Sequence, residues 1–525
     1  MFAPPPCDEG IIHAGVASTP CAKSSGRWIL AATILASSMV FIDGTAVNVA
    51  LPALQASLNA NVLDVQWVVE SYSLLFASLL LVGGSLGDHY GRRRFFVLGL
   101  AIFAAASLGC GFSANIGQLI AARAVQGFGA ALLVPGSLAL ISTSFRSEER
   151  GRAIGTWSAF TAITTAVGPV FGGWLIEHIS WRAIFFLNLP LAFCIVIISL
   201  RCIAESRDRT EKGNLDWRAA ILTVLGLGSL VYGLIESSRL GFTAPPVFTT
   251  LLAGIFFLIG FLILEARMHN PMLPLALFRS RDFSGSNLLT FFLYSAIGGT
   301  LFFLPLNLIQ VHGYTPTAAG AALLPFILII FVLSRWAGGL VHGYGAKVPL
   351  VIGPIIVAIG LVLCVLPGAN GSYWSTFFPA IVVLGLGMAV SVAPLTTTVM
   401  NSVPQTLVGT ASGINNAIAR TGGLLAIAVL GIVMVHTFNR ELDQRVTRFE
   451  LSREVTQMMD ANRTKLAGFT LPEEIEPALR ASLKQSIDDS FVVGFRQIMF
   501  IGATLTLVSA LSAAVLITGK SKTDS

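Results

Sequence analysis

The chain contains fourteen apolar stretches, each about long enough to cross a lipid bilayer as one helix. Such a helix needs about 17 to 25 mostly apolar residues, because hydrocarbon offers no partner for backbone N–H and C=O groups. Only 11% of the 525 residues are charged, against about 25% in soluble domains, which excludes a water-soluble protein. We therefore expect an all-α polytopic membrane protein. The predicted spans are residues 28–50, 66–87, 95–113, 117–141, 153–175, 184–203, 217–236, 247–266, 284–310, 317–339, 348–367, 375–399, 406–437 and 491–518.

The lysines and arginines of the short loops are distributed unevenly between the two sides of the predicted membrane. With both chain ends on one side, that side carries 20 of these residues and the other carries 2. Because basic loops stay in the cytoplasm, we expect a multi-pass cell-membrane protein with cytoplasmic tails at 1–27 and 519–525. The net charge of +6 is too scattered to indicate nucleic acid. The expected partners are the bilayer and small hydrophobic substrates, and an accessory envelope protein is left open.

Residues 438–489 form a long polar loop on the outer side of the predicted membrane. The loop carries 8 basic and 10 acidic residues, and Leu442, Val446 and Phe449 give it an apolar face at helical spacing. We predict a helical hairpin that stands on the membrane surface.

Two short patterns near the start of the chain recur in its second half. Residues 84–93 (GSLGDHYGRR) resemble residues 338–347 (GGLVHGYGAK), and residues 151–155 (GRAIG) resemble residues 409–413 (GTASG). Each pair links one element of spans 1–6 to the same element of spans 9–14, which is typical of a transporter with two six-helix halves. We expect halves at 28–203 and 283–518, and a linker at 204–282 with two extra spans. Chance recurrence of glycine and arginine is the alternative.

The loop after the second span combines glycines, a carboxylate and arginines: Gly84, Asp88, Gly91, Arg92 and Arg93. Glycines at positions 83, 87 and 91 are four residues apart, a spacing that lets neighbouring helices approach closely. Asp88 can pair with basic groups across the helix interface and hold one conformation. We favour this gating role over a solvated loop whose arginines only fix the topology.

Two ionisable residues lie inside apolar spans at matching depth. Asp43 in span 1 is roughly 10 Å from the outer end of its helix, and Arg123 in span 4 is roughly 9 Å from its own. Because an unpaired ion in hydrocarbon costs several kcal/mol, both side chains should face the protein interior. We predict a proton-exchanging site formed by Asp43 and Arg123, with a purely structural salt bridge as the alternative.

Span 2 carries Glu70 at a similar depth, beside the aromatic residues Trp67, Tyr72 and Phe76. A carboxylate among aromatic rings attracts organic cations, so we predict that Glu70, Trp67 and Tyr72 bind cationic substrates. The alternative is that Glu70 is hydrated and only marks the helix end. Arg420 in span 13 either lines the substrate path or pairs with a backbone carbonyl, and the sequence does not favour either.

Span 5 contains Gly168, Pro169, Gly172 and Gly173. Gly168 and Gly172 share one helix face, and the proline distorts the helix next to it. We predict that this face makes close, sliding contact with a helix of the other half, and an ordinary proline kink is the alternative.

Other chemistries find little support in the sequence. The six cysteines show no CxxC or Cys/His spacing, the seven histidines are dispersed, and no GxxxxGK[ST] phosphate loop is present. Neither catalytic residues, nor metal ligands, nor ATP-driven pumping are therefore expected. Two alternatives remain for the function. One is export or import of a specific metabolite or metal chelate by the same fold, and the other is a membrane sensor or scaffold that does not transport.

Taken together, these motifs resemble the fourteen-helix drug:proton antiporters of the major facilitator superfamily, over residues 28 to 518. Residues 84–94 look like the superfamily loop motif, and Arg123, Gln126 and Gly127 look like its span-4 motif. Gly155, Gly168, Pro169, Gly172 and Gly173 resemble the span-5 motif associated with antiport. Asp43, Thr45, Asn48, Leu51 and Pro52 resemble the span-1 motif, and residues 181–190 resemble the opening of span 6.

The resemblance implies a major facilitator fold: two six-helix halves plus an inserted two-helix hairpin, with fourteen transmembrane helices. It implies multidrug efflux of hydrophobic compounds, cations among them, by alternating access. Protons would be the coupling ion and no other cofactor would be needed. Asp43 and Arg123 would act in coupling, and Asp88 in gating. Two positions depart from the family pattern: His89 replaces a basic residue, and Thr164 replaces a glycine of the antiport motif.

Overall fold

The computed structural model describes residues 23–518, except 146, 207–216, 269–270, 272, 369–371, 405–406, 450, 470 and 473. The predicted tail at 519–525 and most of the tail at 1–27 lie outside the described residues. The described chain opens with helix α2 at Lys23, five residues before the first predicted span.

The fourteen predicted spans all fall on helices, within a few residues at their ends. Eleven stretches of described helix are long and apolar enough to cross a membrane, and α14 is a shorter apolar helix. The first six spans correspond to α2 (Lys23–Leu58), α3 (Val62–Tyr90), α4 (Arg92–Phe112), α5 (Ile116–Ser144), α6 (Ser147–His178), and α7 (Arg182–Phe186) followed by α8 (Asn188–Cys202).

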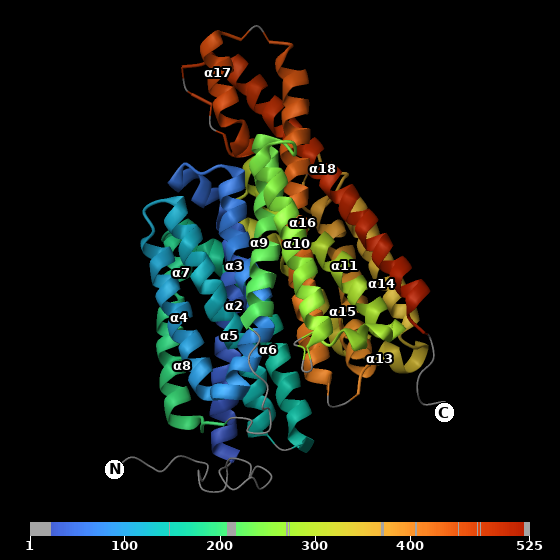
Figure 1. The fold of residues 1–525 in the computed structure, drawn as a ribbon. Helices are drawn as coiled ribbons and strands as arrows, with labels where there is room; N and C mark the ends of the chain where they lie inside the picture. The colour runs from blue at the N-terminus through green and yellow to red at the C-terminus, as the bar shows by residue number, and fades with distance from the viewer. Residues whose placement is uncertain are drawn as a thin grey trace.

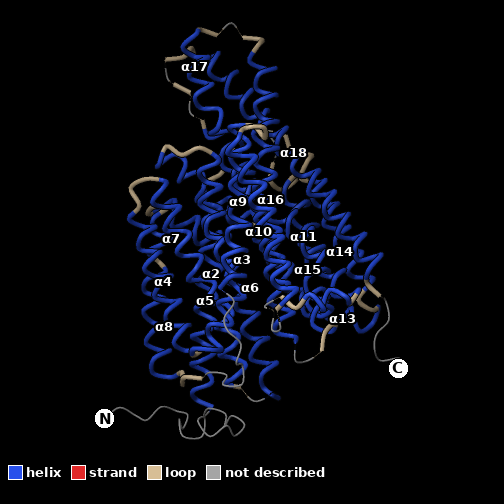
Figure 2. Tube along the Cα trace, viewed as in Figure 1, coloured by secondary structure: helices blue, strands red, loops and turns tan. Residues whose placement is uncertain are grey.

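The two extra spans are α9 (Trp217–Leu240) and α10 (Pro245–Arg267). The second half follows the short helix η1 (Leu275–Arg279). It consists of α11 (Arg281–Leu306) continued by η2 (Asn307–Val311), α12 (Pro316–Ala322), α13 (Leu324–Tyr344), α14 (Lys347–Leu363), α15 (Phe377–Asn401), α16 (Val408–Val446) and α18 (Pro477–Leu516). Figure 2 shows helices joined by loops along the described chain.

The helices form two bundles that lie side by side (Figure 1). In the first bundle α3 and α4 pack against α5, and α2 packs against α6 and α8. In the second bundle α13 and α14 pack against α15, while α11 packs against α16 and α18. Helices α9 and α10 pack on each other, and α9 contacts both α3 and α16. The inserted hairpin of α9 and α10 therefore packs where α3 of the first half lies near α16 of the second. The expected major facilitator fold is confirmed.

The loop predicted at 438–489 is helical, but its arms are extensions of two membrane helices. Helix α16 has 39 residues and α18 has 40, each about 60 Å long, roughly twice the hydrocarbon thickness. Their ends project beyond the bundles and hold α17 (Arg453–Asn462) and η4 (Arg463–Gly468) between them (Figure 1). We call this side the loop face. The opposite side, where α2 begins and α18 ends, is the terminal face.

Candidate functional site

Asp43 and Arg123 form a buried ion pair in the first half. Arg123 Nη1 donates to Asp43 Oδ2, and each residue is only 1% exposed. Helix α2 runs toward the loop face and α5 runs away from it, so the two residues meet at one level, as the depth estimate predicted. Pairing lowers the high cost of two isolated charges in a dry interior.

Three neutral side chains complete the network around this pair. Gln126, one turn from Arg123 on α5, accepts from Arg123 Nη1 at 2.7 Å and donates to Asp43 Oδ1 at 2.9 Å. Asn188 at the start of α8 also donates to Asp43 Oδ1, at 3.1 Å. Ser107 Oγ on α4 accepts from both amides, at 2.8 Å from Gln126 and 3.1 Å from Asn188. The network around the Asp43 carboxylate thus joins four helices of one half, α2, α4, α5 and α8.

Arg123 is fixed by two further contacts that involve α3. Its Nε donates to the Val68 carbonyl at 3.2 Å, and its guanidinium lies over the Tyr72 ring, 4.1 Å from the ring centre. The Tyr72 hydroxyl in turn donates to the Val40 carbonyl at 3.3 Å. The predicted cation site includes Tyr72 beside Glu70, whereas in the structure the Tyr72 ring stacks on Arg123.

Glu70 is fully buried, which contradicts the alternative of a hydrated residue at the helix end. Neither of its carboxyl oxygens has a hydrogen-bond partner among the described residues. One turn before it, Gln66 donates to the Ile427 carbonyl of α16 at 3.3 Å, and Trp67 packs on Tyr232 of α9 with ring centres 6.2 Å apart. Cation binding by Glu70 stays a prediction, and it requires the carboxyl group to become accessible.

Arg420 lies in the second half and reaches toward aromatic rings of the first. Its guanidinium is 3.6 Å from the centre of the Phe76 ring on α3 and 5.8 Å from that of Phe41 on α2. Of the two options that the sequence left open, this position favours a place along the boundary between the halves.

The glycines of α6 make close contacts with two different helices. The contact made by Gly168 and Gly172 differs from the predicted one. A Cβ on Gly168 would lie 2.2 Å from Thr45 Oγ1, and one on Gly172 would lie 2.6 Å from the Ala46 Cβ. This face therefore packs on α2 of its own half, beside Asp43, and the predicted contact with the other half is wrong for these two glycines. A shared helix face follows from the spacing, whereas the identity of the partner helix depends on the tertiary fold.

The adjacent face of α6 makes the contact between the halves. A Cβ on Gly173 would lie 2.4 Å from the Pro316 carbonyl oxygen, and one on Gly320 would lie 2.2 Å from that of Pro169. Pro169 and Gly173 are four residues apart and so share a face of their own. Beside them Thr317 Oγ1 donates to Glu177 Oε2 at 2.5 Å. We call this contact between α6 and α12 the loop-face seam.

The two halves are joined toward the loop face, and several glycines toward the terminal face are exposed. At the loop face, Gln310 donates to Gln55 at 2.6 Å and Lys465 donates to Asn59 at 2.6 Å. Toward the terminal face, four glycines have nothing within 4 Å of an added Cβ: Gly155 on α6, Gly339 and Gly343 on α13, and Gly409 on α16.

The loop after α3 is held by a carboxylate that belongs to none of the predicted motifs. Glu205, three residues after α8, accepts from the backbone N–H of Arg93 and of Arg94, each at 3.1 Å. Arg93 also donates to the Ile203 carbonyl at 3.0 Å. An anion at the N-terminus of α4 satisfies its free N–H groups and its dipole. The predicted gating residue Asp88 has a side chain outside the described residues.

Gly83 and Gly91 serve the same loop in different ways. A Cβ on Gly83 would lie 2.1 Å from the Ala131 carbonyl oxygen of α5, so this glycine allows the close helix contact that its spacing predicts. Gly91 separates α3 from α4 with φ of 122°, a conformation that favours glycine. Gly84 packs more loosely, with a Cβ position 3.5 Å from Pro135, and the Gly87 position is 3.9 Å from Arg92.

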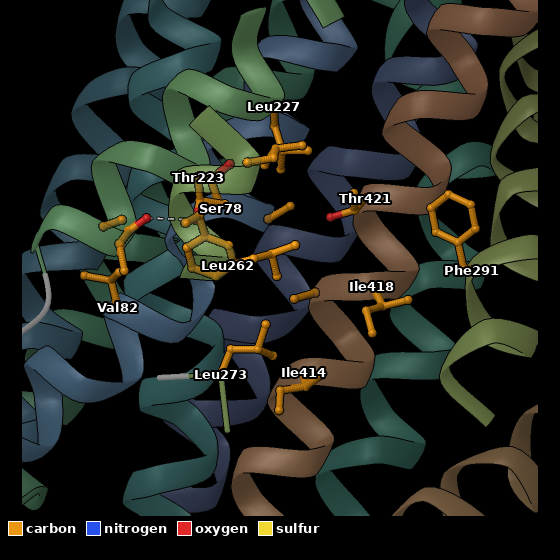
Figure 3. A pocket seen from close by; sticks show the side chains of 16 residues that line it. Ser78, Val82, Thr223, Leu227, Leu262, Leu273, Phe291, Ile414, Ile418 and Thr421 are labelled. Atoms are coloured by element: carbon orange, nitrogen blue, oxygen red, sulfur yellow. Dashed lines mark hydrogen bonds between the residues drawn. The ribbon is translucent and has the colours of Figure 1, made fainter. Parts of the chain in front are cut away.

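An apolar cavity of about 310 Å³ lies where the inserted hairpin meets both halves. Figure 3 shows Ser78 and Val82 of α3, Thr223 and Leu227 of α9, and Thr421 of α16 around it. Most of the remaining lining is aliphatic or aromatic, from α9, α10, α11 and α16. Its volume is at the lower end of the range of small-molecule sites.

Comparison with known proteins identifies relatives over most of the chain. Residues 33–427 match the family described as Major Facilitator Superfamily. The multidrug resistance protein Stp of Mycobacterium tuberculosis (strain CDC 1551 / Oshkosh) is 35% identical over 425 residues, which cover 80% of this chain and 78% of that protein. The tetracenomycin C resistance and export protein of Streptomyces glaucescens is 32% identical over 519 residues, covering 97% and 95%.

Solved structures support the same fold. A bacterial homologue of the human lysosomal transporter Spinster, crystallised in an inward-facing and unoccupied conformation, superposes with a TM-score of 0.64. The match covers 94% of this chain and 98% of that one at 16% sequence identity, so it bears on the fold alone.

Proposed function

The chain belongs to the Major Facilitator Superfamily, whose members are transporters, and we propose that it exports hydrophobic drugs or toxic compounds in exchange for protons. The names of two relatives support export of this substrate class, because one is a multidrug resistance protein and the other a resistance and export protein. The buried Asp43–Arg123 pair carries the proposal of proton coupling.

In this proposal the terminal face is cytoplasmic, in a cell membrane. The support is the bias of 20 against 2 basic residues in short loops. The structure then corresponds to a state closed toward the outside, since the halves touch at the loop face. Export requires the opposite state, in which the loop-face seam separates and the terminal ends close.

Protonation of Asp43 would change which of these states is stable. With Asp43 ionised, its charge and that of Arg123 compensate each other inside one half. A proton on Asp43 removes one of the two charges and leaves the Arg123 guanidinium without its counterion. An unpaired buried charge costs about 3 to 5 kcal/mol, which is large enough to shift a two-state equilibrium by more than a hundredfold.

Helix α6 provides a physical connection from this pair to the loop-face seam. Its Gly168 and Gly172 pack on Thr45 and Ala46, which follow Asp43 on α2 by two and three residues. Its next face, with Gly173, packs on α12 of the other half. A change in α2 near Asp43 therefore reaches the seam through one helix, α6, which contacts both.

Efflux measurements in cells test the proposed function. Cells that express the chain and cells with an empty vector are loaded with a panel of fluorescent dyes and antimicrobials, and efflux is followed with and without a protonophore. We expect faster efflux of several hydrophobic compounds only in expressing cells, and loss of this difference when the protonophore collapses the gradient. Efflux that survives collapse of the proton gradient would overturn proton coupling, and no efflux of any compound would overturn drug export.

A further inference from the structure

Arg420 is a cation in the membrane-spanning part of α16 that no carboxylate neutralises within the described chain. None of the ion pairs formed by described residues includes it. Its close neighbours are rings: the guanidinium lies 3.6 Å from the Phe76 ring centre and 5.8 Å from that of Phe41. A guanidinium over an aromatic face is stabilised, but its charge is not cancelled.

The surrounding contacts orient Arg420 toward the other half. On α16, Asn415 donates to Asn287 at 3.1 Å and to Thr290 at 2.7 Å, both on α11, and Ser295 of α11 donates to the Gly422 carbonyl at 3.0 Å. These bonds fix one face of α16 to its own half. Arg420 projects from a different face and meets Phe76 and Phe41 of the first half, so it lies at the boundary that alternating access must open.

The acidic groups near this level do not offset its charge. Asp43 is engaged by Arg123 and is 1% exposed, and Glu70 is fully buried. Arg420, in contrast, is half-buried. Among the described residues at this boundary, the charge available to a bound molecule is therefore positive. A positive charge favours anionic substrates, whereas the prediction for Glu70 was a preference for cations.

We propose that Arg420 selects substrates that combine a flat aromatic body with an acidic group. A guanidinium is suited to both parts, since it stacks on aromatic faces and donates two parallel hydrogen bonds to a carboxylate. The apolar cavity runs along the same two helices, since its lining includes Ala77 and Ser78 of α3 and Ala417 and Thr421 of α16. This inference rests on the proposed export function and names its substrate class.

Three pyrene probes with the same aromatic body and different charges test the inference by binding alone. The probes are pyrenebutyric acid, its methyl ester and a pyrenebutyl trimethylammonium salt, and fluorescence titration of the purified full chain gives each Kd. The ratio of the ester Kd to the acid Kd should exceed 1 in the wild type and fall by roughly 10- to 100-fold in Arg420→Gln, the range expected for a charged hydrogen bond. Arg420→Lys should lie between them, because it keeps the charge but loses the planar fork.

Arg496→Gln is the matched control, since Arg496 donates to the Val365 and Pro367 carbonyls at 2.9 and 3.3 Å, and these bonds stay within the second half. It should leave the ratio unchanged within about twofold. Equal weakening of all three probes in Arg420→Gln would show a structural contact between α16 and α3 and overturn the inference. A wild-type preference for the ammonium probe would also overturn it, even if Arg420→Gln fails to fold. Neither result depends on whether export is observed.

Discussion

Gly173 of α6 lies directly against Pro316 of α12, so that a Cβ on Gly173 would be 2.4 Å from the Pro316 carbonyl oxygen. The atom it would meet belongs to the backbone and cannot rotate away. Any side chain at this position must therefore push the two halves apart at the loop face. Alternating access requires this seam to close and open. The absence of a side chain at Gly173 therefore affects the equilibrium between the state with a closed seam and the state with an open seam.

Gly173→Ala should shift the protein away from the closed loop-face seam. Overpacking typically costs about 1 to 3 kcal/mol, which corresponds to a shift of about 5- to 150-fold in the inward–outward equilibrium. Thiol labelling of a cysteine placed at Thr317 should become faster, and efflux should become slower. Gly155→Ala is the control, because nothing lies within 4 Å of its added Cβ. Equal behaviour of the two variants would exclude a specific role for the seam.

Glu205→Ala should destabilise the protein by about 1 to 2 kcal/mol, because two N–H groups at the start of α4 lose their acceptor. Thermal unfolding in detergent measures this loss. Arg94→Ala should cost less than about 0.5 kcal/mol, because Arg94 is 74% exposed and its ion pair with Glu205 spans 3.7 Å. A larger loss for Arg94→Ala than for Glu205→Ala would mean that the ion pair, rather than the cap, holds the loop.

Glu177 should not contribute to the pH dependence of transport near neutrality. The hydrogen bond from Thr317 lowers the pKa of Glu177 below its ordinary value of 4.5. A lowered pKa means that the ionised group favours the seam above that ordinary value, and that this contribution disappears only as the pH falls through the lowered pKa. Between pH 6 and 8, Glu177→Gln should therefore keep the wild-type shape of the rate profile. A shifted profile would place a titrating group at the seam.

The loop face should be extracellular. An impermeant thiol reagent should label a cysteine at Ser452, the exposed N-cap of α17, in intact cells. It should not label one at Tyr344, which is 69% exposed at the end of α13 toward the terminal face. The parent chain without added cysteines gives the background. The opposite labelling pattern would reverse the orientation and with it the direction of transport.

Much of the fold was predictable because a membrane leaves few alternatives. Long apolar stretches must be helices in hydrocarbon, so all fourteen predicted spans match helices. The meeting of Asp43 and Arg123 was predictable for a related reason. The depth of a residue in the membrane follows from its position along a helix. Two opposite charges buried at the same depth are stabilised by pairing with each other.

Other features depend on which helices become neighbours, and local patterns do not contain that information. The spacing of Gly168 and Gly172 predicts a shared face, but only the fold shows that this face meets α2. Glu205 lies 112 residues after Arg93, so no local motif links them. Ser107 is an ordinary serine in an apolar span until α4 brings it beside Gln126 and Asn188.

The most direct test of proton coupling through Asp43 compares two modes of transport in proteoliposomes that contain the purified protein. One mode is accumulation of a dye against its gradient under an imposed pH difference, and the other is exchange of labelled for unlabelled dye without a pH difference. The wild type should perform both. Asp43→Asn should retain exchange at a reduced rate, because Arg123 loses its counterion, and should lose uphill accumulation; the remaining exchange shows that the protein is folded and alternates. Accumulation by Asp43→Asn at the wild-type rate would contradict a coupling role for Asp43.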